Sequence, residues 1–398
     1  MFYCLTFILT TIFIFTFFSI IFHPETNINL GKDDSTLVTV IATVVMIVAM
    51  MCVFLANNFY INNKKKDISV MLMSGASVYQ IGIYLFVQSM LLIIIAIPIG
   101  MIIGYLLMPV LSNLFNDLFI SGSNLYITSD ALVATASILF FEVIWCTYLN
   151  VGYCYRTSVQ KLQQNKIDLE IHGIKMKKRS QFFWIILYII PFILFIINND
   201  TLGYALFACV GIVGVYGLIK HVIPNYINIV ERDKALENDK MFIALGFVRY
   251  NLQKIFILVL ILLISSILLM VFVIHHLAMP LISMLTVVSY ASVMILMSIT
   301  IISKIGMDLQ HRKRNYQHLS YLGYTKKSLK SIMQMEMLLF YGILLCIPLL
   351  YEIVIVGKLV LNQQITLFLG GSMLLIQILP IIISYIISVL MYHKVLPK

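Results

Sequence analysis

The sequence contains few charged side chains. Only 11% of its 398 residues are Asp, Glu, Lys or Arg, whereas 61% are apolar. Soluble globular domains carry about a quarter charged residues, so this composition excludes an ordinary soluble protein. Most of the surface must face lipid, and we predict an all-α polytopic membrane protein.

Motifs for catalysis and metal binding are also missing. The six cysteines lack C-x-x-C spacing and lie mostly in apolar runs, so neither disulfides nor a metal site is predicted. No G-x-x-x-x-G-K-[ST] motif occurs, so this chain cannot hydrolyse ATP itself. An intramembrane enzyme is disfavoured because Glu142, inside an apolar run, has no catalytic companion motif. We expect no catalytic residues and no cofactor of the chain's own.

Long apolar segments recur along the chain. A bilayer core requires about 20 apolar residues per helix, and ten segments are long enough to cross it. The expected spans cover residues 2–22, 37–60, 81–108, 129–150, 182–198, 202–220, 254–275, 281–303, 334–352 and 368–391. The first segment has no basic start and exceeds the core of a signal peptide, so a retained span is predicted. The fifth and sixth spans are the weakest pair.

The basic residues that give the chain its net charge of +10 lie mainly in the connections between the spans. If both termini are cytoplasmic, the outer connections hold only Lys32 and Lys358 of the 27 basic residues. Lys and Arg favour the cytoplasmic side, so both termini are predicted to be cytoplasmic. This distribution indicates contact with membrane lipids and argues against nucleic acid as a partner.

Two segments separated by 248 residues share one pattern. "KKKDISVMLMSGAS", beginning at Lys64, aligns without gaps with "RKRNYQHLSYLGYT", beginning at Arg312. The aligned positions are the basic clusters Lys64, Lys65, Lys66 and Arg312, Lys313, Arg314, then Gly75 with Gly323, Ser77 with Thr325, and Gln88 with Glu336. The basic clusters are expected to be inner-face anchors. We predict a first repeat at 1–150, connections with spans five and six at 151–253, and a second repeat at 254–398.

The chemistry of each segment predicts a short cytoplasmic projection. The preceding helix can extend beyond the membrane by one to three turns at about 1.5 Å per residue. Gly75 and Gly323 permit a left-handed turn, and Ser77 and Thr325 can cap the next helix. A stiff projection joined to two membrane helices could transmit force.

These segments resemble the signature of FtsX-like ABC transporter permeases, and the ten-span arrangement resembles the BceB-like, bacitracin-exporter type. The resemblance implies a separate ATP-binding subunit, expected as a dimer, which holds ATP and Mg. In the family, the segment between these helices contacts that subunit. The resemblance therefore implies that residues 67–80 and 315–328 of this chain make the contact, including Asp67, Gly75, Ser77, Gly323, Thr325 and Lys326. One departure is that only six residues, His275 to Pro280, stand where BceB-like permeases carry a large extracellular domain.

The resemblance implies a permease of the bacterial cell membrane that exports or extracts an amphipathic, antimicrobial or lipid-associated compound. The alternative is a signalling subunit that passes force to a sensor histidine kinase or a cell-wall hydrolase. Ionisable side chains at membrane depth are functional candidates. Glu142 is therefore a candidate for substrate contact or gating, and the resemblance adds Glu336 and the aligned Gln88, which replaces the carboxylate that the second repeat retains.

Overall fold

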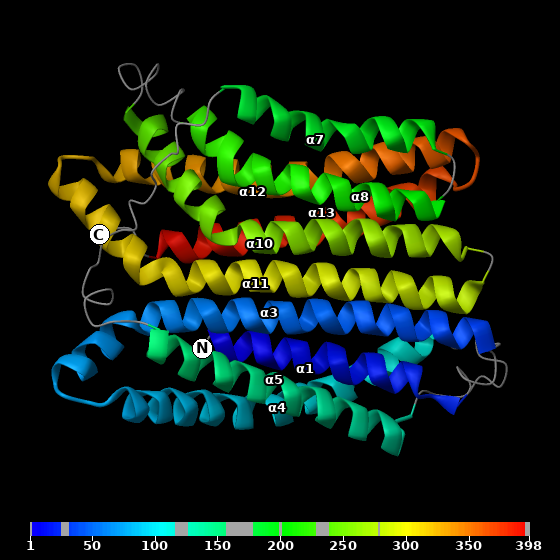
Figure 1. The fold of residues 1–398 in the computed structure, drawn as a ribbon, viewed down its shortest axis with the longest axis horizontal. Helices are drawn as coiled ribbons and strands as arrows, with labels where there is room; N and C mark the ends of the chain where they lie inside the picture. Colours follow the sequence, from blue (N-terminus) through cyan, green and yellow to red (C-terminus); the bar gives the residue numbers. More distant parts are fainter. Residues whose placement is uncertain are drawn as a thin grey trace. The chain divides into compact units, whose positions relative to one another are not determined.

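All secondary structure that the computed structural model describes is helical (Figure 1). The structure describes residues 2–24, 32–115, 126–156, 178–198, 201–227, 239–277 and 279–394. Nine helices in these ranges are long and apolar enough to cross a membrane, and a further apolar helix, Gln181–Ile197, is shorter. The prediction of an all-α polytopic membrane protein is confirmed, while the total of ten spans stays a prediction.

The chain divides into two compact units. Unit 1 comprises Met1–Leu169 and Met279–Met307, and unit 2 comprises Glu170–Ala278 and Asp308–Lys398. Helix α11 (Pro280–Tyr321) therefore contributes its first part to unit 1 and its last part to unit 2. The predicted division into repeats at 1–150 and 254–398 stays a prediction.

Among the residues that the structure describes, unit 1 contains four complete helices. They are α1 (Phe2–Ile21), α3 (Lys32–Met73), α4 (Val78–Phe115) and α5 (Ser129–Arg156). Helix α1 packs against the other three (Figure 1). A Cβ atom on Gly100 of α4 would lie 2.6 Å from Thr11 Cβ, and one on Gly104 would lie 2.7 Å from Phe15. This pair of glycines, four residues apart, lets α4 approach α1 closely, as small residues do in membrane helix pairs.

The described part of unit 2 contains five complete α-helices. They are α7 (Lys178–Ile197), α8 (Thr201–Gly217), which continues into the π-helix η1 (Leu218–Val222), α10 (Asp239–His275), α12 (Lys326–Leu361) and α13 (Leu367–His393). Helix α8 packs against both α7 and α10, and α12 packs against α10 and α13. Gly214 of α8 makes the contact with α7 close, because a Cβ there would lie 2.6 Å from the backbone nitrogen of Tyr188.

The end of α7 is held by a lysine from α12. The Lys358 ammonium donates hydrogen bonds to the carbonyls of Phe195 and Ile196, each at 2.9 Å, and to the carbonyl of Asn198. The last carbonyls of a helix have no partner within that helix. Lys358, which the sequence marks only as a rare cation of the outer connections, therefore caps α7.

Helices α3 and α11 are longer than a bilayer core. Each has 42 residues, which corresponds to about 63 Å, against roughly 30 Å of hydrocarbon. Their apolar spans are Val38–Asn62 and Pro280–Leu309, so about three turns of each helix follow the span. This geometry agrees with the predicted projection beyond the membrane.

Candidate functional site

Two helix turns, one in each unit, have the same position in a repeated helix pair. The helices before the turns begin at Lys32 and Pro280 and end at Met73 and Tyr321, and the helices after the turns begin at Val78 and Lys326. Each of these three boundaries in the second pair lies 248 residues after its counterpart in the first. The gapless alignment of the sequence is thus matched by helix boundaries in the structure.

The first turn ends α3 through a left-handed glycine. Gly75 has φ +91°, and its N–H donates to the Leu72 carbonyl at 3.2 Å. The N–H of Ala76 donates to the Met71 carbonyl at 3.1 Å. These two bonds form a Schellman motif, which satisfies carbonyls at the end of a helix and usually requires glycine at this position.

The second turn repeats this hydrogen-bond pattern residue for residue. Gly323 has φ +95°, and its N–H donates to the Ser320 carbonyl at 3.1 Å. The N–H of Tyr324 donates to the Leu319 carbonyl at 3.2 Å. The predicted left-handed glycine is therefore confirmed at both turns.

Hydroxyl side chains cap the helices that follow. Ser77 Oγ accepts from the Gln80 N–H at 3.3 Å, while Gln80 Oε1 accepts from the Ser77 N–H at 2.9 Å. Thr325 Oγ1 accepts from the Ser328 N–H at 3.3 Å and lies 2.9 Å from the Ser328 hydroxyl. The first arrangement is a reciprocal capping box, so the predicted caps are confirmed. Both turns therefore have a defined backbone conformation with capped helices on either side. Their role in coupling to an ATP-binding subunit stays a prediction.

Apolar side chains stand exposed at both turns, beyond the apolar spans of α3 and α11. Val70 and Met73 are 60% and 55% exposed at the first turn, and Tyr321 and Leu322 are 83% and 76% exposed at the second. A contiguous exposed apolar patch can mark a protein interaction surface, so these side chains are candidates for contact with a partner. Sequence reasoning missed these residues, although an apolar pair directly before Gly323 was a usable signal.

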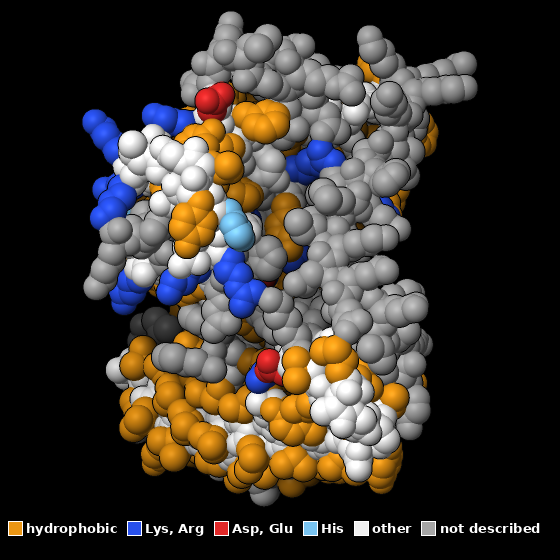
Figure 2. Space-filling view, turned by 90° about the vertical axis from the view of Figure 1, so that its left-hand side faces the viewer, with side chains coloured by type: hydrophobic (Ala, Val, Ile, Leu, Met, Phe, Trp, Pro, Cys, Tyr) orange, Lys and Arg blue, Asp and Glu red, His pale blue; other side chains and the backbone are white. Residues whose placement is uncertain are grey.

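The two turns differ in charge. Around the α11–α12 turn the exposed basic residues are Lys313, Arg314, Lys326, Lys327 and Lys330. Figure 2 shows Lys and Arg side chains gathered on this part of the described surface. At the α3–α4 turn the Lys64 ammonium instead lies 3.2 Å from the Asp67 carboxylate, and the side chains of Lys65 and Lys66 lie outside the described residues. Among the described side chains, the second turn therefore carries more exposed positive charge than the first.

Arg312 departs from the expectation of a lipid-facing anchor, because its side chain is buried. Its Nη2 atom lies 2.8 Å from Glu336 Oε1, and the two side chains are 2% and 0% exposed. Burial alone would lower the pKa of Arg312, but the facing Glu336 carboxylate raises it, so that the pKa lies above its ordinary value. Of this basic cluster, Lys313 and Arg314 remain exposed.

Further groups complete the surroundings of Glu336. Asn251 of α10 donates to Oε1 at 2.9 Å, and the Tyr316 hydroxyl of α11 donates to Oε2 at 3.2 Å. The Phe247 ring lies 4.4 Å from the Arg312 guanidinium carbon. This network ties the end of α11, just before the turn, to α10 and α12. Asn251 and Tyr316 were not predicted, since no local motif marks them.

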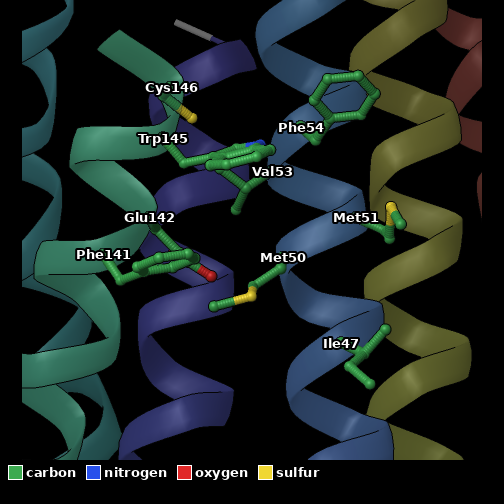
Figure 3. Close-up of a pocket in the computed structure, with 9 residues that line it drawn as sticks. All are labelled: Ile47, Met50, Met51, Val53, Phe54, Phe141, Glu142, Trp145 and Cys146. Atoms are coloured by element: carbon green, nitrogen blue, oxygen red, sulfur yellow. The ribbon is translucent and has the colours of Figure 1, made fainter. Parts of the chain in front are cut away.

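The other two candidates for substrate contact or gating lie in unit 1. Gln88 on α4 is partly buried, and its Oε1 has no hydrogen-bond partner among the described residues. Glu142 on α5 lines a pocket of about 310 Å³ between α3 and α5 (Figure 3). Glu142 and Glu336 thus lie in different units, and a functional role for either stays a prediction.

One part of the chain is similar to a known protein family. Residues 39–150, which include the α3–α4 turn, match the family model described as FtsX-like permease C-terminal. No curated protein matches the chain. FtsX-like permeases are generally non-catalytic membrane subunits that work with an ATP-binding subunit. The chain is a multi-pass protein of the bacterial cell membrane, and its matched region and spans support a role of the ABC-transporter permease type.

Proposed function

We propose that the chain is the membrane subunit of an ABC transporter of the BceB-like type and is driven by a separate ATP-binding subunit that docks on both turns. The observation that carries this proposal is that one glycine turn occurs in both units, with the same backbone hydrogen bonds and a separation of 248 residues. Two equivalent contacts suit a partner with two-fold symmetry. One chain would therefore bind two copies of the ATP-binding subunit, which hold ATP and Mg.

The substrate proposed for this transporter is an amphipathic, antimicrobial or lipid-associated compound, which the permease exports or extracts from the membrane. Apolar side chains are exposed on most of the described spans, so a compound dissolved in the bilayer could reach them. A substrate that partitions into lipid fits this surface better than a strongly hydrated one.

A second candidate function is force transmission to a partner such as a sensor histidine kinase or a cell-wall hydrolase. The observation that favours it is the buried network around Glu336, which ties the end of α11 to α10 and α12. Displacement of the second turn would be passed to these helices even if no substrate moved. Stimulation of ATP hydrolysis by a protein partner alone, and by no lipid or peptide, would favour this function.

Co-purification tests the docking proposal. We expect the tagged chain, solubilised from its own membrane, to retain an ATP-binding protein at two copies per chain, measured by native mass spectrometry. Leu322→Ser removes an exposed apolar contact at the second turn and should reduce the retained protein about tenfold. Leu361→Ser is the matched control, because Leu361 is 84% exposed at the opposite end of α12. Equal retention by both variants would contradict docking at the turn.

A further inference from the structure

A buried carboxylate that has no hydrogen-bond partner in the described part of the chain lies near mid-membrane depth in unit 1. Glu142 stands near the middle of the span Ser129–Tyr153 and is only 3% exposed. Neither of its carboxylate oxygens has a hydrogen-bond partner among the described residues. A polar group that is buried without a hydrogen bond destabilises the fold, so Glu142 is a candidate binding group rather than a packing residue.

The carboxylate lies in an otherwise apolar pocket. The pocket has a volume of about 310 Å³ and is formed by one face of α3 and one face of α5. Figure 3 shows the Glu142 side chain extending from α5 toward Met50 of α3, with the Phe141 ring beside it. The pocket can therefore receive an apolar group and offers it one charged or hydrogen-bonding contact.

Two aromatic rings stand next to the carboxylate. Phe141 and Trp145 are stacked, with ring centroids 6.1 Å apart and an angle of 19° between the rings. Both rings line the pocket and are about half exposed. Aromatic faces attract cations, and the attraction is stronger when water is excluded. The two rings and the carboxylate therefore all favour a ligand with a positive charge.

The depth of the pocket indicates how a ligand would reach it. Ile47 and Met51 on the α3 side are about half exposed and lie within the span Val38–Asn62. The pocket therefore opens among side chains at the level of the hydrocarbon. A ligand that enters there must first dissolve in the bilayer, which selects compounds with a large apolar part.

We propose that this pocket binds an amphiphile whose polar group is a primary or secondary ammonium. The ammonium N–H groups would donate to the two free oxygens of Glu142, and the positive charge would lie beside Phe141 and Trp145. A quaternary ammonium has the charge but no N–H, so it should bind more weakly. The proposal goes beyond the permease role and does not depend on it, because binding needs no ATP-binding subunit.

Fluorescence quenching in the full-length chain tests the proposal. The chain has two tryptophans, so Trp184→Phe leaves Trp145 in the pocket as the single reporter. The probe is decyl(para-bromobenzyl)amine, added to this variant in lipid nanodiscs, and decyl para-bromobenzyl ether serves as the neutral isostere. We expect saturable quenching by the amine, and by the ether only a rise proportional to its concentration in the lipid.

Substitutions in the pocket separate recognition from partition into lipid. Glu142→Gln should weaken the apparent affinity for the amine about tenfold or more, because a buried charge loses its partner. Phe141→Leu should weaken it less, through loss of one ring face. Phe140→Ala is the matched control on the same helix, because Phe140 is exposed and does not line the pocket, and it should leave the affinity unchanged.

Three results would overturn the proposal. They are saturation by the ether with the affinity of the amine, an unchanged amine affinity in both Glu142→Gln and Phe141→Leu, and no saturable quenching by the amine in the parent chain. If Glu142→Gln does not fold, Phe141→Leu and the amine-to-ether comparison still decide the outcome. None of these results bears on docking of the ATP-binding subunit, which is measured separately.

Discussion

At the scale of single residues, Lys64 and Arg312 occupy equivalent positions but meet different surroundings. Arg312 and Glu336 form a buried pair, whereas Lys64 and Asp67 form an exposed one. Removing one member of a buried pair leaves an uncompensated charge. We expect Glu336→Gln to lower the free energy of unfolding by about 3–5 kcal/mol, measured by chemical denaturation in detergent micelles.

The exposed pair supplies the control for this prediction. Asp67→Asn should change the free energy of unfolding by less than about 1 kcal/mol, because surface ion pairs are weak. Replacing both buried members, as Arg312→Met with Glu336→Leu, should recover most of the loss. Similar losses from Glu336→Gln and Asp67→Asn would show that the buried pair contributes no more than the surface pair.

The sequence indicated Arg312 and Glu336 separately but did not indicate that they meet. Their contact depends on the rotation of α11 and α12 about their axes, and Asn251 joins from 85 residues away. Charge alone does not distinguish a buried arginine from an anchor at the lipid surface. The pocket at Glu142 was unpredictable for the same reason, since α3 and α5 form it together.

At the scale of helices and turns, substitution of the two left-handed glycines tests whether the turns are coupled to ATP hydrolysis. A Cβ atom at Gly75 or Gly323 would meet nothing within 4 Å, so a valine there costs energy only through the positive φ. That cost is about 1–3 kcal/mol at each site. We expect Gly75→Val or Gly323→Val to lower ATP hydrolysis by the reconstituted complex about tenfold while membrane insertion continues.

Gly342→Val is the control for these substitutions. Gly342 lies inside α12 with open space around its Cα, and valine has a higher helix propensity than glycine. This variant should insert and hydrolyse ATP as the parent complex does. Normal ATP hydrolysis in both turn variants would show that the turns do not carry the coupling.

The turns were predictable because their chemistry is local. A glycine, a hydroxyl two residues later and flanking apolar runs specify a Schellman motif followed by a cap, whatever surrounds them. The close packing of α4 on α1 was missed, although Gly100 and Gly104 form a visible G-x-x-x-G motif. That motif shows that a close contact is made but does not show which helix makes it.

At the scale of the whole molecule, the side of the membrane on which the turns lie can be measured. The positive-inside rule places both turns in the cytoplasm. In a cysteine-free background, we expect an impermeant maleimide to label Ser74→Cys and Ser320→Cys in inverted vesicles and not in protoplasts. Both serines are exposed in the structure, so access of the reagent is not limited by burial.

Gln364→Cys is the control for the labelling experiment. Gln364 is exposed in the connection between α12 and α13, at the other end of α12. It should be labelled in protoplasts and protected in inverted vesicles. Labelling of the Ser74 and Ser320 variants from the outside would reverse the orientation and remove the proposed site from the ATP-binding subunit.

The lysine cap on α7 bears on how the chain is made. The carbonyls of Phe195 and Ile196 accept hydrogen bonds from Lys358, which lies more than 160 residues later in the sequence. Unpaired carbonyls at a membrane helix end are costly in lipid. During synthesis α7 therefore emerges before Lys358, which caps its end. Unit 2 reaches its final hydrogen bonding only after α12 has entered the bilayer.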